Sequence, residues 1–134
     1  MTGEGRRYAA GVELRLGAEE LRGAEVLLAA GHPRLAVGRI SFAAFHAARA
    51  RLFAEDLEPK THAGVQHLFN LTFVKPGNYE ASLSQMLARL QKYREDADYS
   101  TSFVVDVARV ENELGSVREF LERMRRDVAA EDTA

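Results

Sequence analysis

An alanine-rich segment in the first half of the sequence narrows the architectures open to this chain. Residues 35–54 read LAVGRISFAAFHAARARLFA, a pattern interrupted mainly by Arg39, His46, Arg49 and Arg51. A helix that is apolar on nearly every face lies either at the centre of a bundle or against a partner. The alanines also allow neighbouring helices to approach closely. The segment therefore predicts a central helix over residues 33–55, and a partner-facing role for it stays open.

Regular apolar spacing predicts a long helix near each end of the chain. Leu14, Leu21 and Leu28 recur every seven residues and predict a helix over residues 8–30, which Gly31 and Pro33 terminate. A last helix over residues 103–129 is predicted from a single apolar stripe, formed by Val107, Leu114, Val117, Leu121, Met124 and Val128. Residues 131–134 should fray.

Two further helices are predicted between these elements. Thr61 is a plausible N-cap for a short helix over residues 62–73. Ser82 and Gln85 have the spacing of a capping box that opens a helix ending near residue 97. Helices joined by short connections pack as antiparallel neighbours. The sequence thus predicts one all-α domain over residues 1–134, an up-and-down bundle of four long helices and one short helix with its core at 8–129.

Composition and charge exclude several classes of protein. The chain has 134 residues and no cysteine, which excludes disulfides, thiolate metal sites and cysteine nucleophiles. No segment has the length and apolar character of a signal peptide or a membrane span, so a cytoplasmic protein that does not enter the membrane is expected. The net charge is −2, although residues 31–75 carry six basic and three acidic residues, or +3. Any polyanion site should therefore involve the middle of the chain.

Two candidate sites combine a basic residue with a histidine. Arg39 and His46 lie seven residues apart on one face of the central helix, where they could stabilise an oxyanion and transfer a proton. A histidine in such a helix is more often a hydrogen-bonded core residue, and that alternative stays open. Lys60 and His62 flank the start of the short helix, where backbone N–H groups attract anions such as phosphate. His62 could instead pack at the junction between loop and helix.

A third candidate lies at the end of the predicted helix over residues 82–97. Arg94 and Asp98 are four residues apart and can pair along a helix, and Tyr99 adds a phenol at its end. A surface ion pair beside a tyrosine at the edge of the core would give the same pattern. The sequence contains no Gly-rich phosphate loop, no GxSxG or HExxH motif and no Glu-x-x-His pair. No cofactor or metal site is therefore predicted.

Three ordered segments resemble the HEPN family (higher eukaryote and prokaryote nucleotide-binding). They are SFAAFHAARARLF in the central helix, PKTHAGV leading into HLFNLTFVKPG, and REDADY after a leucine-rich helix, together covering about residues 8–125. The resemblance implies a helical bundle that commonly forms a homodimer. Many such proteins are metal-independent ribonucleases with an Arg-x4–6-His motif. Many are also toxins encoded beside a minimal nucleotidyltransferase antitoxin, which can modify them.

The resemblance places the motif's arginine at Arg94. No histidine follows within the motif's reach, and Asp98 and Tyr99 stand where it is expected. We therefore expect Arg94, Asp98, Tyr99 and His62 to line a ribonuclease-like cleft that binds RNA or a nucleotide. Lys60, His46, Arg39 and Arg49 are the expected binding residues.

Two alternatives to a ribonuclease remain. The first is a non-catalytic interaction or nucleotide-binding module, in which the apolar surplus of the central helix joins a dimer or an interface with the nucleotidyltransferase. The second is a bundle that binds a small molecule in a polar pocket around His46 and Arg49.

Overall fold

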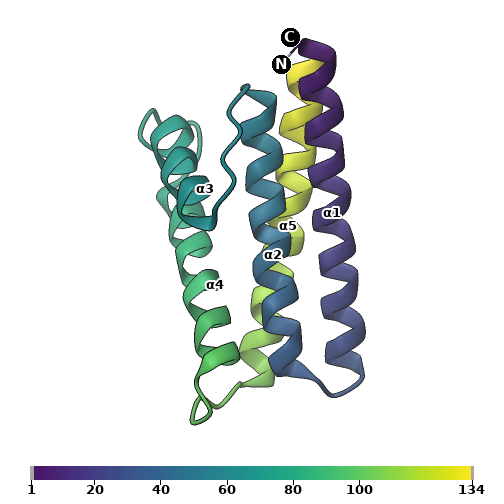
Figure 1. The fold of residues 1–134 in the computed structure, drawn as a ribbon, viewed down its shortest axis with the longest axis vertical. Coiled ribbons are helices and arrows are strands. Elements are labelled where there is room, and N and C mark those ends of the chain that lie inside the picture. The colour runs from purple at the N-terminus through teal and green to yellow at the C-terminus, as the bar shows by residue number, and fades with distance from the viewer. Residues whose placement is uncertain (1, 134) are drawn as a thin grey trace.

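The chain folds into antiparallel helices, and the computed structural model describes residues 2–133. The elements follow in the order α1 (Gly3–Ala29), α2 (Pro33–Ala54), α3 (His62–Phe69), the short π-helix η1 (Asn70–Val74), α4 (Ala81–Tyr99) and α5 (Val107–Thr133). The four long helices run alternately down and up, and α3 with η1 lies beside the upper half of α4 (Figure 1). The predicted all-α bundle of four long helices and one short helix is therefore confirmed.

Helix α2 is the central element of the bundle, as the alanine-rich segment predicts. It packs against α1, α5, α4 and α3, and more than half of its residues are buried. Small residues bring α1 and α2 close together: a Cβ atom added at Gly17 would lie 3.3 Å from the carbonyl oxygen of Ala43 and 3.5 Å from Cβ of His46. Close packing with α1 leaves the side chains at this level of α2 in direct contact with α1.

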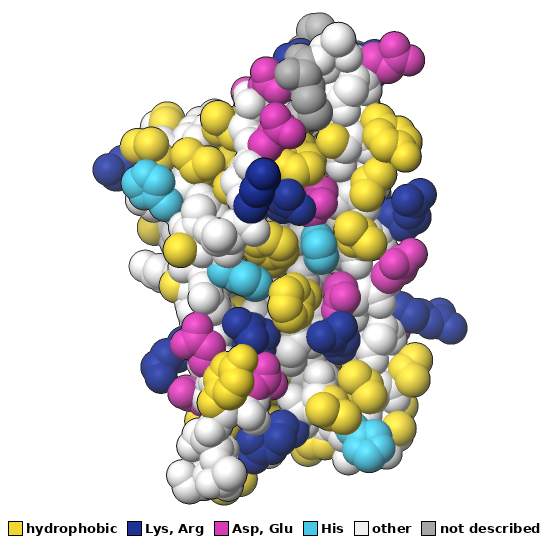
Figure 2. All heavy atoms as spheres, viewed as in Figure 1, with side chains coloured by type: hydrophobic (Ala, Val, Ile, Leu, Met, Phe, Trp, Pro, Cys, Tyr) yellow, Lys and Arg dark blue, Asp and Glu magenta, His cyan; other side chains and the backbone are white. Residues whose placement is uncertain are grey.

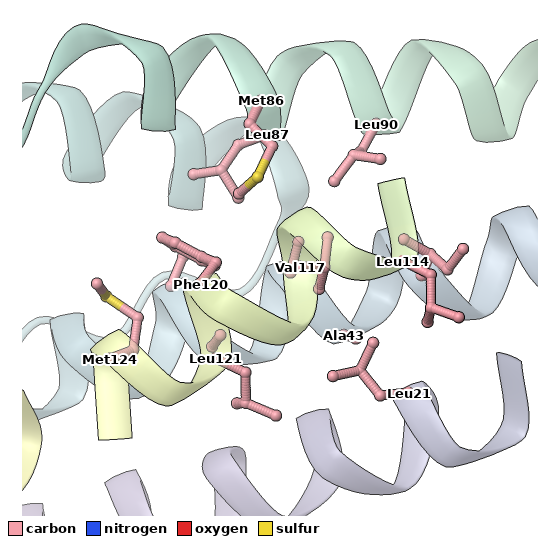
Figure 3. Packing of buried hydrophobic residues seen from close by; sticks show 14 of the residues in the cluster. Leu21, Ala43, Met86, Leu87, Leu90, Leu114, Val117, Phe120, Leu121 and Met124 are labelled. Carbon is pink, nitrogen blue, oxygen red and sulfur yellow. The ribbon is translucent and has the colours of Figure 1, made fainter. Parts of the chain in front are cut away.

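Large apolar side chains fill the space between α2, α4 and α5. Figure 3 shows α4 and α5 facing each other through Met86, Leu87, Leu90, Val117 and Phe120, all of them buried. Each fully buried side chain of this size contributes about 1.5–3 kcal/mol relative to an exposed one. No helix within residues 2–133 has both the length and the hydropathy needed to cross a membrane.

Two predicted helix boundaries are formed by the expected residues. Gly31 follows α1 with a φ of +84°, a left-handed conformation that glycine adopts without a steric penalty. Thr61 caps α3, since its Oγ1 accepts a 2.9 Å hydrogen bond from the backbone N–H of Gly64. Helix α1 begins at Gly3, earlier than predicted, and α5 continues to Thr133. Ala134 lies outside the described residues.

The predicted capping box at the start of α4 is wrong. The helix begins at Ala81, and its N-cap is Glu80, which makes no side-chain capping hydrogen bond. The Glu80 carboxylate instead accepts a 2.6 Å hydrogen bond from Arg123 on α5. Ser82 and Gln85 are both exposed within the helix. The predicted capping box therefore does not form, and the N-cap residue is bonded to another helix.

The predicted start of the last helix at Phe103 is also wrong, because α5 begins at Val107. The guanidinium of Arg34 donates to the backbone carbonyls of Ala97 and Phe103, which holds the connection against the start of α2. Asp106 accepts a 3.0 Å hydrogen bond from a backbone N–H in the first turn of α5. Val107 is 47% exposed, so it does not belong to the buried stripe.

A buried polar network joins α2, α5 and the turn before α4. Arg51 donates to Glu55, to Glu131 and to the hydroxyl of Tyr79, at 3.0–3.1 Å. Tyr79 in turn donates a 2.6 Å hydrogen bond to Asp127. The arginine is thereby desolvated but has partners on three segments, which offsets the cost of burying its charge.

Candidate functional site

Polar side chains gather over the middle of α2, on the face that α1, α3 and α4 border. Figure 2 shows histidine side chains beside basic and acidic ones on this face. We define the α2 cluster as ten side chains joined by the contacts described below: Glu13, Glu20, Arg39, Phe42, Phe45, His46, Arg49, His62, Arg94 and Asp98. Six of the eight site residues predicted from the sequence lie in this cluster.

His46 is held by a buried carboxylate from α1. Its Nδ1 lies 2.6 Å from Oε2 of Glu13, whose side chain is only 6% exposed. The other carboxylate oxygen of Glu13 accepts a 2.9 Å hydrogen bond from Arg49. The Nε of Arg49 also donates a 2.8 Å hydrogen bond to the carbonyl oxygen of Pro59, and the guanidinium lies over the ring of Phe53. The cluster thus ties α1 and α2 to the loop before α3.

Arg39 makes the equivalent contact one heptad away. Its guanidinium lies 3.1 Å from Glu20 on α1, and the pair is more exposed than Glu13 and His46. Arg39 and His46 are seven residues apart on α2, and Glu13 and Glu20 are seven apart on α1. Because the two helices run antiparallel, each acidic residue meets its own basic partner. The prediction that Arg39 and His46 share one helix face is confirmed by these partners.

Two phenylalanines of α2 pack against His62, and one of them, Phe45, also contacts His46. The ring of Phe45 stacks on His62 at 4.4 Å between centroids and meets His46 edge-on at 5.3 Å. The two imidazole rings are therefore no more than about 10 Å apart. Phe42 packs edge-on against His62 at 5.2 Å, with the guanidinium of Arg94 5.5 Å from its centroid. Both phenylalanines are half-buried, so part of each ring faces solvent.

His62 is positioned to stay neutral at neutral pH. Burial lowers the pKa of its imidazole, and the positive charge of Arg94 and the neighbouring His46 lower it further, against a smaller opposing effect of Glu95. Its Nε2 atom is buried and has no hydrogen-bond partner within the described residues. A buried nitrogen without a partner calls for an explanation such as a water molecule or a ligand. His62 therefore contacts the cluster through its ring, and its buried Nε2 is left without a partner within the described residues.

Arg94 and Asp98 pair along α4, as their spacing predicts. Arg94 Nη1 lies 3.3 Å from Oδ2 of Asp98, and the arginine Nε is buried without a partner within residues 2–133. The aliphatic part of Arg94 packs against α2, since a Cβ added at Gly38 would lie 4.0 Å from its Cγ. The guanidinium of Arg94, paired with Asp98 on α4, therefore lies over the ring of Phe42 on α2.

Tyr99 and Lys60 lie outside the cluster. Tyr99 is 78% exposed at the end of α4, and it borders an open surface depression together with Arg94, Glu95, Asp96 and Ser100. Lys60 is exposed in the loop before α3 and makes no ion pair with another described residue. A role for either residue remains a prediction.

Four members of the cluster were not predicted as site residues: Glu13, Glu20, Phe42 and Phe45. The two acids carry a readable signal, because their seven-residue spacing matches that of Arg39 and His46 on the next antiparallel helix. The cluster holds three arginines and three acids, so it is balanced in charge when both histidines are neutral. Within residues 2–133 no three acidic or histidine side chains gather in a way that could hold a metal ion.

Comparison with known proteins agrees with this architecture. The sequence model of the HEPN domain matches residues 13–127, which include all ten side chains of the α2 cluster. A protein of Methanocaldococcus jannaschii described as a candidate toxin is 36% identical over 88 residues, 66% of each chain. A second protein of that organism with the same description is 28% identical over 91 residues, which span 62% of its length.

A third relative aligns over more of both chains. A UPF0332 protein of Thermotoga maritima is 30% identical over 108 residues, 81% of this chain and 82% of its own. The helical bundle, the match to the family over most of the sequence and these relatives agree. The chain belongs to the HEPN domain family.

Proposed function

We propose that this protein is the toxin component of a two-gene toxin–antitoxin module and acts on RNA by ribonuclease-like chemistry. The partner in this proposal is a minimal nucleotidyltransferase that serves as the antitoxin. Two relatives described as candidate toxins support the first part. The observation that carries the chemistry is the meeting of Arg94 and His62 at the ring of Phe42.

Cleavage of an RNA phosphodiester needs a cation for the phosphate and groups that move protons. Arg94 offers a guanidinium whose Nε has no hydrogen-bond partner within residues 2–133, and the planar guanidinium fork suits phosphate oxygens. A neutral imidazole has one N–H donor and one lone pair, so His62 can hydrogen-bond a phosphate oxygen at neutral pH. Helix α4 carries Arg94 but no histidine. His62, at the start of α3, would supply the imidazole beside this arginine.

The half-buried rings of Phe42 and Phe45 suit the bases of a single strand. Stacking of a base on an aromatic ring contributes about 1–3 kcal/mol and tolerates any base. In the single chain, the open depression beside Arg94 and Tyr99 faces solvent. We expect a homodimer that brings two such depressions together, in which case RNA would lie between the copies.

The proposal is tested by cleavage and by growth. Purified protein is incubated with a fluorescent single-stranded RNA, with and without divalent cations, and the gene is induced in cells with and without the nucleotidyltransferase gene. Arg94→Ala should reduce cleavage at least tenfold and relieve growth arrest. Arg118→Ala is the matched control, because it removes an exposed interhelical pair with Glu25 that involves no side chain of the cluster. Intact RNA and normal growth with the unaltered protein would refute the proposal.

A second function, a non-catalytic interaction module, is favoured by the charge balance of the cluster. Each of its three arginines already has a carboxylate partner, Glu13, Glu20 or Asp98. The apolar surplus of α2 gives this function less support, because most of it is buried within the chain's own bundle. This second function is supported if the protein binds the nucleotidyltransferase tightly and Arg94→Ala changes neither cell growth nor the amount of RNA cleaved.

A further inference from the structure

Glu13 is the most buried charged member of the α2 cluster, and it comes from a helix that contributes nothing to the Arg-x4–6-His pattern. Both of its carboxylate oxygens are bonded within the cluster, one to His46 Nδ1 at 2.6 Å and the other to Arg49 at 2.9 Å. Burying a carboxylate is costly unless its partners are well placed. An apolar side chain would pack here more cheaply, so the charge calls for a reason beyond packing.

The geometry of this pair fixes which nitrogen of His46 carries the proton in the neutral ring. A carboxylate only accepts hydrogen bonds, so Nδ1 must donate to Glu13. In the neutral imidazole Nε2 then keeps its lone pair. An imidazole held in this way by a carboxylate is the arrangement that prepares a histidine to accept a proton from a hydroxyl group.

Arg49 holds the carboxylate in one orientation. Its guanidinium is fixed by the carbonyl of Pro59 and lies 4.6 Å from the ring centroid of Phe53. The neighbouring pair of Glu20 and Arg39 has no backbone carbonyl as a third partner within residues 2–133, although Arg39 lies 5.5 Å from the ring centroid of Phe42, and it is more exposed. The two heptad-related pairs are therefore unlike: one holds α1 against α2 at the surface, and the other encloses an oriented imidazole beside Phe45 and His62.

We propose that Glu13 is a positioning residue that holds His46 as the proton acceptor of the α2 cluster. This proposal rests on the proposed function. It adds the imidazole of His46 to the two groups already assigned to RNA cleavage, Arg94 and His62. In the step we assign, His46 Nε2 takes the proton of an RNA 2′-hydroxyl while the 2′-oxygen forms a bond to phosphorus. The bond from phosphorus to the 5′-oxygen breaks, and that oxygen takes a proton from water. The products are a 2′,3′-cyclic phosphate and a 5′-hydroxyl.

The first test does not depend on RNA. Long-range nitrogen–proton NMR spectra of the full-length protein at mildly alkaline pH show which nitrogen of each neutral histidine is protonated, and His46→Gln identifies the His46 signals. We expect the proton on Nδ1 in the unaltered protein and a shift towards Nε2 in Glu13→Gln. Glu20→Gln, which alters the matched carboxylate on the same helix, should leave the spectrum of His46 unchanged. A proton on Nε2 in the unaltered protein would overturn the proposal.

The second test measures cleavage. General base catalysis contributes about 100-fold or more, so Glu13→Gln should lower kcat by about that factor with little change in KM. Its pH–rate profile should lose the limb that reports the proton acceptor. Glu25→Gln, which alters an exposed glutamate of α1 outside the cluster, should keep both rate and profile. Thermal unfolding of both variants shows whether each is folded, and His46→Gln serves as the second variant if Glu13→Gln is not.

The outcomes separate this proposal from the proposed function. If the unaltered protein cleaves RNA and Glu13→Gln and His46→Gln, both folded, cleave it equally well, the positioning role is wrong and the function stands. If the unaltered protein leaves RNA intact, the function fails and the proton-acceptor role fails with it. The NMR result still decides in that case whether Glu13 orients the ring.

Discussion

The hydroxyl of Tyr79, in the turn before α4, donates a 2.6 Å hydrogen bond to Oδ2 of Asp127 on α5. The Tyr79 hydroxyl oxygen also accepts a 3.0 Å hydrogen bond from Nε of Arg51 on α2. One phenol therefore connects an anion and a cation that belong to different helices. Because Arg51 is buried, loss of this phenol would leave one of its donors without a partner.

Tyr79→Phe should lower the free energy of unfolding by about 1–3 kcal/mol, the usual cost of leaving a buried polar group unsatisfied. The ring and its packing on Phe69 are retained, so the loss reports the hydroxyl alone. Tyr99→Phe is the control, because that hydroxyl is exposed, and its effect should stay within about 0.5 kcal/mol. Urea unfolding followed by circular dichroism gives both values. Equal stability of the two variants would contradict the prediction.

The same phenol should make stability fall at alkaline pH. Burial and the hydrogen bond to Asp127 raise the pKa of Tyr79 to about 12, whereas the unfolded chain has a tyrosine pKa of 10.0. Between these values the unfolded state loses a proton that the folded state keeps, so stability declines as pH rises. The slope is at most about 1.4 kcal/mol per pH unit. Urea midpoints measured on either side of pH 10 should show the decline, and Tyr79→Phe should show less of it.

The imidazole of His62 should titrate below its ordinary range and respond to Arg94. Burial is the main cause of its lowered pKa, and the charges of Arg94 and His46 add to it while Glu95 opposes it. Arg94→Gln removes one charge, so the pKa of His62 should rise towards 6.5 without reaching it. Proton NMR titration of the His62 ring measures this, with Arg118→Gln as a control that should leave the curve in place.

The same shift has a consequence for stability in acid. As the pH falls below about 6.5, the unfolded chain takes up a proton at His62 that the folded chain does not, so the folded state loses stability. A midpoint for His62 at or above 6.5 in the unaltered protein would contradict both expectations.

Two glycines of α1 should respond in opposite directions to the same substitution. In Gly17→Ala the new methyl group would lie 3.3 Å from the carbonyl oxygen of Ala43 and from Leu121 Cδ1, so the helices must move apart, at a cost of about 1–3 kcal/mol. At Gly11 nothing lies within 4 Å of an added Cβ. Gly11→Ala should therefore stabilise the protein by up to about 1 kcal/mol through helix propensity. Thermal unfolding of both variants measures the two stability changes, and destabilisation by Gly11→Ala would contradict the prediction.

The parts of the fold that the sequence predicts correctly depend on local or strongly periodic signals. Thr61 caps α3 through a hydrogen bond three residues along the chain, and Gly31 ends α1 through its own backbone conformation. The start of α4 could not be predicted in this way, because its N-cap, Glu80, makes no local side-chain hydrogen bond and is bonded to Arg123, more than forty residues away. Long-range contacts of single side chains leave no local pattern.

The candidate site shows the same division. The spacing of Arg94 and Asp98 predicts their ion pair, and His62 was found from its place at the start of a helix. Glu13 was missed because an isolated glutamate in an amphipathic helix is ordinarily a solvated residue. Its burial depends on Gly17, which lets α1 approach α2 closely enough to enclose the carboxylate. Only pairing the heptads of two helices would have placed it beside His46.

Glu13 and Glu20 pair with His46 and Arg39 at the same seven-residue spacing. This matched spacing also constrains the register of α1 along α2. Sliding α1 by seven residues along α2 would keep the small apolar residues in rough alignment, because their pattern repeats. One such slip sets Glu13 against Arg39 but brings Arg6 opposite His46, and the opposite slip sets Glu13 against Phe53. Each misaligned state leaves a charged group facing the wrong partner, so the two matched pairs favour the observed alignment of α1 and α2 over these alternatives.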